Sequence, residues 1–291
     1  MCMMALDSYC RYLAVMEALN YTKMSGAGNT FIMLDGRELA GDADLAALAP
    51  VLCADSQEHG GADGLIAVYP WDQGDFRMRY YNRDGSSGMM CGNGGRCAVQ
   101  YASDLGLVAD TSSITFTNAG VTYHAMLTPR GVKVLFPDPL GFRLNFHLDL
   151  LGESRLCHYA DVGTPHAIMF IDELGDPSLE HVAQLDLNLW GHNLRHHAAF
   201  APGGANANFV EVKPDGSGIL LRTYERGVEA ETGACGTGAI SSAVVAAMLR
   251  GLTSPLAVTT SSGRTLWVDF RMEQEHVTGV SLEGDAEVVG R

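Results

Sequence analysis

Two cysteines could do acid–base chemistry because of the residues that follow them. Cys91 begins the stretch CGNGG and Cys235 begins CGTGA, and an apolar run of helical length follows each stretch. The N-terminus of a helix has free N–H groups and a partial positive charge, which stabilise a thiolate and hold carboxylates. Glycines beside it let a ligand approach the backbone closely. Each stretch therefore predicts a thiol of lowered pKa next to a site for a carboxylate.

The two cysteines occupy equivalent positions in an internal repeat. GADGLIAVYP at 61–70 aligns with ANANFVEVKP at 205–214 at the same offset that separates the cysteines. RYYN at 79–82 and RTYE at 222–225 precede the two cysteines in the same way. A chance likeness of strand–turn–helix units would not keep several matches in one order. Self-similarity on this scale predicts two halves of one architecture.

A pseudo-twofold arrangement of these halves would make the two helix starts face each other across a cleft. One bound carbon atom would then have a thiolate on one side and a thiol on the other. Inversion of a stereocentre needs this pair, because a proton leaves from one face and another arrives at the opposite face. The sequence thus predicts a two-thiol acid–base enzyme.

Short β-rich runs with alternating apolar residues supply most of the remaining pattern. Apolar helices are expected at about 94–105 and 237–249, directly after the cysteine stretches, and a smaller amphipathic helix at 43–52. Two prolines in FPDPLG, residues 136–141, interrupt the strand pattern and mark the expected boundary between the halves. The fold class expected is α/β (α+β), with two similar domains related by a pseudo-twofold axis.

The composition excludes several classes of protein. The 291 residues include 34 acidic and 19 basic side chains, a formal charge of −15, which argues against nucleic-acid and anionic-membrane partners. No apolar run approaches the ~20 residues that span a bilayer, and the N-terminal stretch has no signal-peptide pattern, so a cytoplasmic location is expected. The seven cysteines are odd in number and form no C-x-x-C pair, which predicts neither a disulfide framework nor a zinc ribbon.

At the cysteine stretches the chain resembles the diaminopimelate epimerases, which interconvert LL- and meso-diaminopimelate in lysine and peptidoglycan precursor biosynthesis. The resemblance covers nearly everything after residue 20. Its motifs are KMSGAGNTFIMLD, YYNRDGSSGMMCGNGGRC, VGTPHAIMF, GANANFVEV and YERGVEAETGACGTGA. It implies an enzyme without cofactor or metal, a homodimer, and an active site in the cleft between two domains, each a curved, mostly antiparallel sheet around a central helix.

The resemblance also implies the domain limits. Residues 1–20 form an N-terminal extension. Residues 21–136 together with 284–291 form the first domain, because the C-terminal strand GDAEVVGR returns to complete it. Residues 137–283 form the second domain.

Site residues follow from the resemblance position by position. Cys91 and Cys235 match the catalytic pair, with Cys235 as the base toward the LL substrate and Cys91 as the acid. Glu225 matches a contact to the reacting amino group, and Arg226 matches the group that binds the distal carboxylate. His166 and Glu225 match the residues that tune the cysteines. The implied substrate-binding set is Asn29, Asn82, Gly92, Asn93, Thr164, Asn206, Glu225, Arg226, Gly236 and Thr237.

Two departures from the family pattern affect this set. Thr164 stands where the family commonly has asparagine, and a threonine has no amide N–H to donate. The stretch from Glu225 to Cys235 is one residue longer than in many members, so the loop that carries Glu225 and Arg226 is expected to differ.

Other functions fit part of the pattern. A proline-racemase-like enzyme would use the same two thiols, but that family typically has histidine in place of Asn93 and lacks the distal set with Arg226. A non-catalytic amino-acid-binding protein would need the carboxylate site without paired thiols. A redox sensor would pair Cys91 with Cys97.

Three histidines in GHNLRHH suggest a metal site at first sight: His192, His196 and His197. No carboxylate or cysteine pattern accompanies them, and such short motifs often match by accident. The stretch is therefore interpreted as a solvated turn in a loop.

Overall fold

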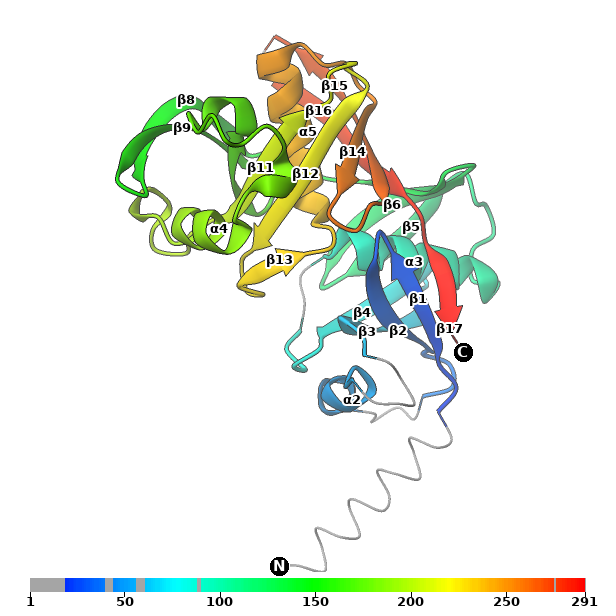
Figure 1. The fold of residues 1–291 in the computed structure, drawn as a ribbon. Coiled ribbons are helices and arrows are strands. Elements are labelled where there is room, and N and C mark those ends of the chain that lie inside the picture. Colours follow the sequence, from blue (N-terminus) through cyan, green and yellow to red (C-terminus); the bar gives the residue numbers. More distant parts are fainter. Residues whose placement is uncertain (1–18, 40–43, 56–60, 88–89, 275, 291) are drawn as a thin grey trace, which may run out of the picture.

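Two sheet-rich halves lie side by side, each with one helix at its centre (Figure 1). The computed structural model describes residues 19–39, 44–55, 61–87, 90–274 and 276–290. Among these residues, no helix combines the length and apolarity needed to cross a bilayer.

The first half is a run of seven strands in chain order. They are β1 (Thr22–Gly26), β2 (Asn29–Asp35), β3 (Gly64–Pro70), β4 (Phe76–Asn82), β5 (Ile114–Asn118), β6 (Val121–Thr128) and β7 (Gly131–Leu135). Each strand pairs with the next, and all pairs are antiparallel except β2–β3 and β4–β5. Helix α2 (Leu45–Leu52) lies between β2 and β3 in the chain, and α3 (Gly92–Asp104) lies between β4 and β5.

The second half repeats this pattern. Its strands are β8 (Gly141–Leu150), β9 (Glu153–Asp161), β10 (Pro165–Phe170), β11 (Asn206–Val212), β12 (Gly218–Glu225), β13 (Ala230–Thr232), β14 (Leu256–Thr260), β15 (Thr265–Glu273) and β16 (His276–Gly284). The run β9–β10–β11–β12–β14–β15–β16 has the same order of antiparallel and parallel pairs as β1 to β7. Helix α4 (Leu187–Arg195) precedes β11, and α5 (Gly236–Arg250) precedes β14. Three short 3₁₀ helices complete this half: η1 (Ile171–Glu173), η2 (Val182–Gln184) and η3 (Ala198–Phe200).

Two pairings connect the ends of the halves. β7 pairs antiparallel with β16, so hydrogen bonds join the two sheets. The last strand, β17 (Glu287–Gly290), pairs antiparallel with β1 and thus lies in the first half (Figure 1). The domain limits 21–136 plus 284–291 and 137–283 stay a prediction.

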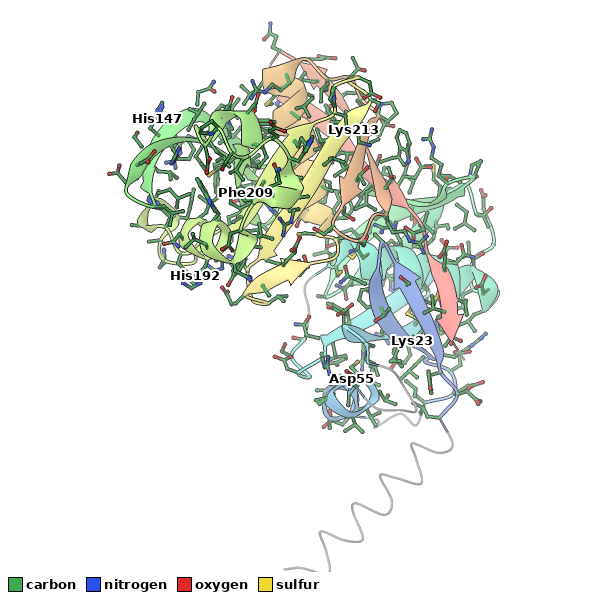
Figure 2. All side chains as sticks on the ribbon, in the orientation of Figure 1. Lys23, Asp55, His147, His192, Phe209 and Lys213 are labelled. Carbon is green, nitrogen blue, oxygen red and sulfur yellow. The ribbon has the colours of Figure 1, made fainter. Side chains whose placement is uncertain are left out.

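The central helices pack inside their sheets. α3 contacts β1 to β4 and β7, while α5 contacts strands from β9 to β16. β1 approaches α3 closely at Gly26, where a Cβ atom would lie 2.7 Å from the carbonyl oxygen of Asn93. Phe209 of β11 lies in the interior of the second half (Figure 2). The expected fold, two similar domains with a mostly antiparallel sheet around a central helix, is confirmed.

The structure corrects the interpretation of GHNLRHH. His192 lies inside α4, exposed on its outer face (Figure 2), and His196 is the C-cap of that helix. Asp186 caps the N-terminus, and Leu187, Trp190 and Leu194 are buried at helical spacing. The prediction of a loop was therefore wrong for His192, whereas His196 lies in an exposed turn after the helix and His197 follows it. Within the described part of the chain, no group of three or more His, Cys, Asp or Glu side chains could hold a metal ion.

Candidate active site

The N-termini of the two central helices meet between the halves. Cys91 is the N-cap of α3 and Cys235 is the N-cap of α5, both with extended backbone angles. A Cβ atom built on Gly236 would lie 3.5 Å from the Cα of Gly92. The helices begin at Gly92 and Gly236, slightly earlier than the expected positions 94 and 237, so each cysteine directly precedes its first helical turn.

Burial has a larger effect on the two thiols than the helix N-termini have. The N–H groups of Gly94 and Asn93 lower the pKa of Cys91, but desolvation raises it more. Cys235 is 6% exposed, and its pKa is raised by burial first and then by the charge of Glu225. The predicted lowering of the thiol pKa was therefore wrong in sign, because the loss of water around the thiols outweighs the N–H donors.

Glu225 is the charged group beside both thiols. It is the last residue of β12, and its Oε2 accepts a hydrogen bond of 2.7 Å from Thr232. Burial raises the pKa of the Glu225 carboxyl, while hydrogen bonds from Thr232 and Cys235 lower it in part. Its negative charge raises the pKa of Cys91 as well as that of Cys235. A buried carboxylate that contacts a thiol can accept its proton or repel its thiolate.

Glu225→Gln is expected to stabilise the protein at neutral pH. A carboxyl whose pKa is higher in the folded state binds more protons there, so stability falls as pH rises from the ordinary 4.5 through the raised value. The melting temperature of the variant should exceed that of the wild type at pH 8, and the difference should vanish near pH 4.

Glu231→Gln in the adjacent strand β13 is a matched control with the opposite sign. Arg222 holds the pKa of Glu231 below its ordinary value, so this variant should be less stable than the wild type at pH 8. If Glu225→Gln also lost stability at pH 8, the folded protein would stabilise the charged form of the Glu225 carboxyl, which would contradict a raised pKa.

Asn93 connects the first helix with the second half. Its Nδ2 donates to Oδ1 of Asn29 (2.6 Å) and to the carbonyl oxygen of Ala234 (3.0 Å), the residue before Cys235. Its Oδ1 accepts from Arg96 (3.0 Å). The side chain of Asn93 is thus engaged by partners within the protein, so a ligand would contact its backbone N–H. Asn29 in turn donates to Asp63 (3.2 Å).

Arg96 is a structural participant that the sequence reasoning missed. Its side chain is fully buried in α3, and the guanidinium donates to the carbonyl oxygens of Gly92 and Asp285 besides Asn93. A charged residue within an otherwise apolar helix start was the available signal, because buried arginines need several acceptors. Arg96 supports the carbonyl of the residue that follows Cys91.

Asn82 is connected with the site through Tyr80. Its Oδ1 accepts from the Tyr80 hydroxyl (2.8 Å), and its Nδ2 donates to Ser86 (2.9 Å). Burial raises the pKa of Tyr80, and the charges of Cys91 and Glu225 add to this effect. Tyr80 was not predicted from the sequence. It lies near the thiols, whereas the hydrogen bonds of Asn82 belong to a local turn.

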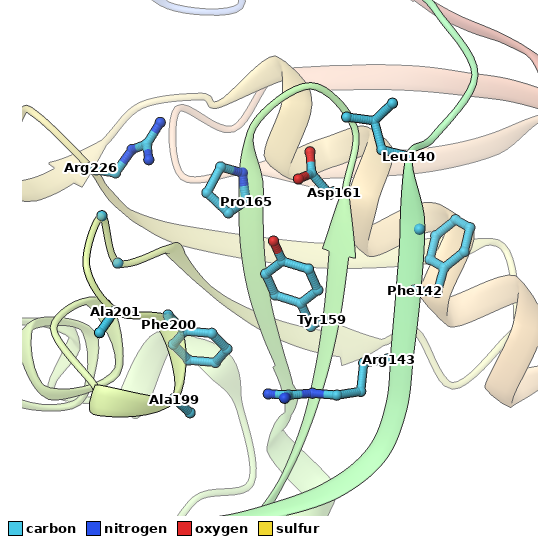
Figure 3. A pocket seen from close by; sticks show the side chains of 13 residues that line it. Leu140, Phe142, Arg143, Tyr159, Asp161, Pro165, Ala199, Phe200, Ala201 and Arg226 are labelled. Atoms are coloured by element: carbon cyan, nitrogen blue, oxygen red, sulfur yellow. The ribbon is translucent and has the colours of Figure 1, made fainter.

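Arg226 follows Glu225 and borders a cavity of about 550 Å³. The backbone N–H of Arg226 donates to Oδ1 of Asn206 (2.8 Å), whose Nδ2 donates to the carbonyl oxygen of Pro165 (3.2 Å). In Figure 3, Tyr159 and Asp161 lie below and beside Pro165 along the cavity, with Arg226 at its edge. Among the described residues, no carboxylate lies within ion-pair distance of the Arg226 guanidinium. The guanidinium can therefore receive a carboxylate from a ligand.

Neither cysteine lines this cavity. Glu225 and Arg226 are adjacent in the chain, so the pair connects the thiols with the cavity. Among the other candidates, Gly236 and Thr237 lie in the first turn of α5, and Thr237 Oγ1 is 3.6 Å from the Cys235 sulfur. Thr164 precedes β10, and its Oγ1 lies 3.0 Å from His166 Nε2.

His166 is a neutral, fully buried side chain. Its Nδ1 accepts from Asn208 Nδ2 (3.0 Å), which leaves the proton on Nε2 to be donated to Thr164 Oγ1 (3.0 Å). Burial lowers the pKa of His166 to about 3. We expect its imidazole nitrogens, followed by long-range ¹H–¹⁵N NMR, to keep one tautomer from pH 5 to 8. A titration near pH 6.5 would contradict this environment. If His166 influences the thiols, it does so as a neutral dipole.

Comparison with known proteins is consistent with this geometry. The profile of the family described as diaminopimelate epimerase matches residues 21–133 and 158–289. The diaminopimelate epimerase of Chlorobaculum tepidum is 39% identical over 271 residues, which cover 92% of this chain and 98% of that protein. The diaminopimelate epimerase of Flavobacterium psychrophilum is 34% identical over 92% of this chain and 96% of its own.

Solved structures of low sequence identity share the fold. A phenazine biosynthesis protein of the PhzF family from Bacillus anthracis superposes with a TM-score of 0.68 at 15% identity, over 93% of this chain and 97% of that one. A probable proline racemase from Agrobacterium radiobacter gives 0.66 at 15% identity, over 94% and 91%. At such identity the likeness concerns the fold alone, whereas the sequence matches extend over nearly the whole chain. The chain belongs to the diaminopimelate epimerase family.

Proposed function

We propose that this isomerase interconverts LL- and meso-diaminopimelate by proton transfer between Cys235 and Cys91, without a cofactor. The observation that carries the proposal is the contact between the N-termini of α3 and α5, each capped by a cysteine. This geometry supports a single carbon atom held between two sulfur atoms. The substrate is proposed from the family to which the chain belongs.

In the reaction, one proton is removed from the α-carbon and another proton is added to its opposite face. The Cys235 thiolate takes the α-proton of the LL substrate and becomes a thiol. The Cys91 thiol gives its proton to the opposite face of the carbanion and becomes a thiolate. The reverse direction exchanges these roles, and proton exchange with solvent restores the starting pair.

The helix starts also stabilise the carbanion. N–H groups of Gly92, Asn93, Gly236 and Thr237 lie at the first turns of α3 and α5, which are directed at the region between the thiols. A substrate carboxylate bound there would receive charge as the carbanion forms, and preorganised dipoles in a dry site stabilise such charge strongly.

Burial of the thiols helps the proton abstraction itself. A thiolate of raised pKa is a stronger base, which reduces the mismatch with the very weakly acidic α-carbon. The substrate's ammonium group, held near Glu225, adds a positive charge that stabilises the buried thiolate. Substrate binding would thus prepare the reactive pair.

The distal end of the substrate gives the specificity. We propose that the Arg226 guanidinium binds the distal carboxylate, for which its planar fork is suited. A proline-racemase-like substrate has no second carboxylate and would leave Arg226 without a partner.

The testing experiment is proton NMR of LL-diaminopimelate with the reduced protein in deuterated water. Deuterium at one α-carbon together with formation of the meso isomer would support the proposal. Exchange with proline alone would favour the racemase alternative, and binding without any exchange would favour the amino-acid-binding protein. A cytoplasmic location, expected from the sequence pattern, and a homodimer, implied by the family resemblance, remain predictions.

A further inference from the structure

The turn that carries Arg226 contains a residue in a left-handed conformation. Glu229, between β12 and β13, has a φ of 56°, which non-glycine residues rarely adopt. Its N–H donates to the carbonyl oxygen of Glu225 (2.9 Å) and closes the turn. Such a conformation persists only where surrounding contacts hold it.

The Glu229 carboxylate has partners on both sides of the turn. Its Oε1 accepts from the Nε (3.1 Å) and Nη2 (2.9 Å) atoms of Arg195 and from the N–H of Gly227 (3.0 Å). Its Oε2 contacts Nε2 of His196 (3.1 Å). Arg195 and His196 form the C-terminal end of α4, so one carboxylate fastens the turn to that helix.

Arg195 also holds the segment of the cavity lining that lies next to Arg226. Its Nη1 donates to the carbonyl oxygen of Gly203 (3.1 Å), and its own carbonyl oxygen accepts from Ala205 (3.3 Å). Gly203 lines the cavity with Arg226, and a Cβ on Gly203 would lie 3.5 Å from Nη1 of Arg226. The Arg195 guanidinium thus contacts two segments. One is the turn that carries Arg226, through Glu229, and the other is the segment at Gly203 against which Arg226 lies.

We propose that Arg195 and Glu229 are positioning residues that hold the Arg226 guanidinium ready for the distal carboxylate of the substrate. This inference rests on the proposed function. The Arg195 side chain is 11% exposed and the Glu229 side chain is 40% exposed, so water reaches the carboxylate. What distinguishes the pair from an ordinary surface ion pair is its geometry, because the Glu229 carboxylate makes four polar contacts.

The effect should fall on substrate binding and not on proton transfer. Glu225 is held separately, by its ladder pairing with Ala230 and by the hydrogen bond from Thr232. Loosening the Glu229 contacts therefore leaves Glu225 beside the thiols while Arg226 gains freedom. We expect Glu229→Gln and Arg195→Met to raise KM for diaminopimelate about five- to twenty-fold, with kcat changed less than about threefold.

The decisive experiment is a double-mutant cycle with Arg226→Gln. If Glu229 acts through Arg226, Glu229→Gln should raise KM in the wild-type background and have no further effect in the Arg226→Gln background. Glu287→Gln is the control, because Glu287 also accepts two hydrogen bonds from one arginine, Arg264, away from the cavity. Equal effects in both backgrounds, or an equal effect of Glu287→Gln, would overturn the proposal.

A second measurement does not need the substrate. Hydrogen exchange followed by mass spectrometry should show faster exchange of the amides of Arg226 and Glu229 in Glu229→Gln than in the wild type or in Glu287→Gln. Unchanged exchange would overturn the positioning role even if the enzyme acts on diaminopimelate. Faster exchange in a protein that does not epimerise diaminopimelate would retain the positioning role and reject the proposed substrate.

Discussion

Cys235→Ala is expected to lower the rate of LL-diaminopimelate epimerisation on the order of 10³-fold or more, as is Cys91→Ala. Each thiol serves one face of the substrate carbon, and removal of a positioned general acid or base typically costs 10²–10⁴-fold. Coupled measurement of meso-diaminopimelate formation and of deuterium uptake from solvent checks both steps.

The two readouts should separate in the variants. With the LL substrate, Cys91→Ala retains Cys235, which can remove and return the proton on one face, so slow deuterium uptake without inversion is expected of this variant. Cys235→Ala should show such uptake only with the meso isomer, on which Cys91 acts as the base. Cys53→Ala is the control, because Cys53 is a fully buried thiol, with a pKa raised to about 11, in the packing of α2. Inversion at near wild-type rate in either catalytic variant would contradict the two-thiol mechanism.

Arg226→Gln is expected to raise KM for diaminopimelate about 100-fold. A carboxylate that loses its bidentate cation in a partly buried site loses about 3 kcal/mol, and each 1.4 kcal/mol is a factor of about ten. Arg226→Lys should retain part of the affinity, because lysine keeps the charge but lacks the planar fork. Steady-state kinetics with both stereoisomers gives the measurement.

Arg143→Gln is the matched control for the charge of Arg226. Arg143 lines the same cavity, but its guanidinium lies over the Phe146 ring, 3.6 Å from the centroid. If the general positive charge of the cavity attracted the substrate, both variants would raise KM alike. A loss of kcat in Arg226→Gln with unchanged KM would place Arg226 at the reacting centre and reject its distal role.

Local sequence determined the parts of the site that lie within one turn of the chain. The N-cap positions of Cys91 and Cys235 follow from the pattern C-G-x-G before an apolar run. A helix that begins at the first glycine places its free backbone N–H groups next to the cysteine. The repeat predicted that the halves share one architecture, and the structure shows one pairing order in both. Each of these features depends on residues a few positions apart or on equivalent positions in the two halves.

Tertiary structure decided the features that depend on residues from distant segments of the chain. The thiol pKa values rise because the surroundings desolvate buried Cys235 and half-buried Cys91, and no stretch around either cysteine encodes that desolvation. The sequence did not predict helix α4, which has His196 as its C-cap. The contact of His196 with Glu229 joins segments that are 33 residues apart. Asn93 contacts Ala234 across 141 residues. Local sequence thus determined where the reactive cysteines lie in the chain. The burial that sets their protonation and the contacts that orient their neighbours arise only when the halves pack together. Burial and electrostatic interactions depend on distance in space and not on distance along the chain.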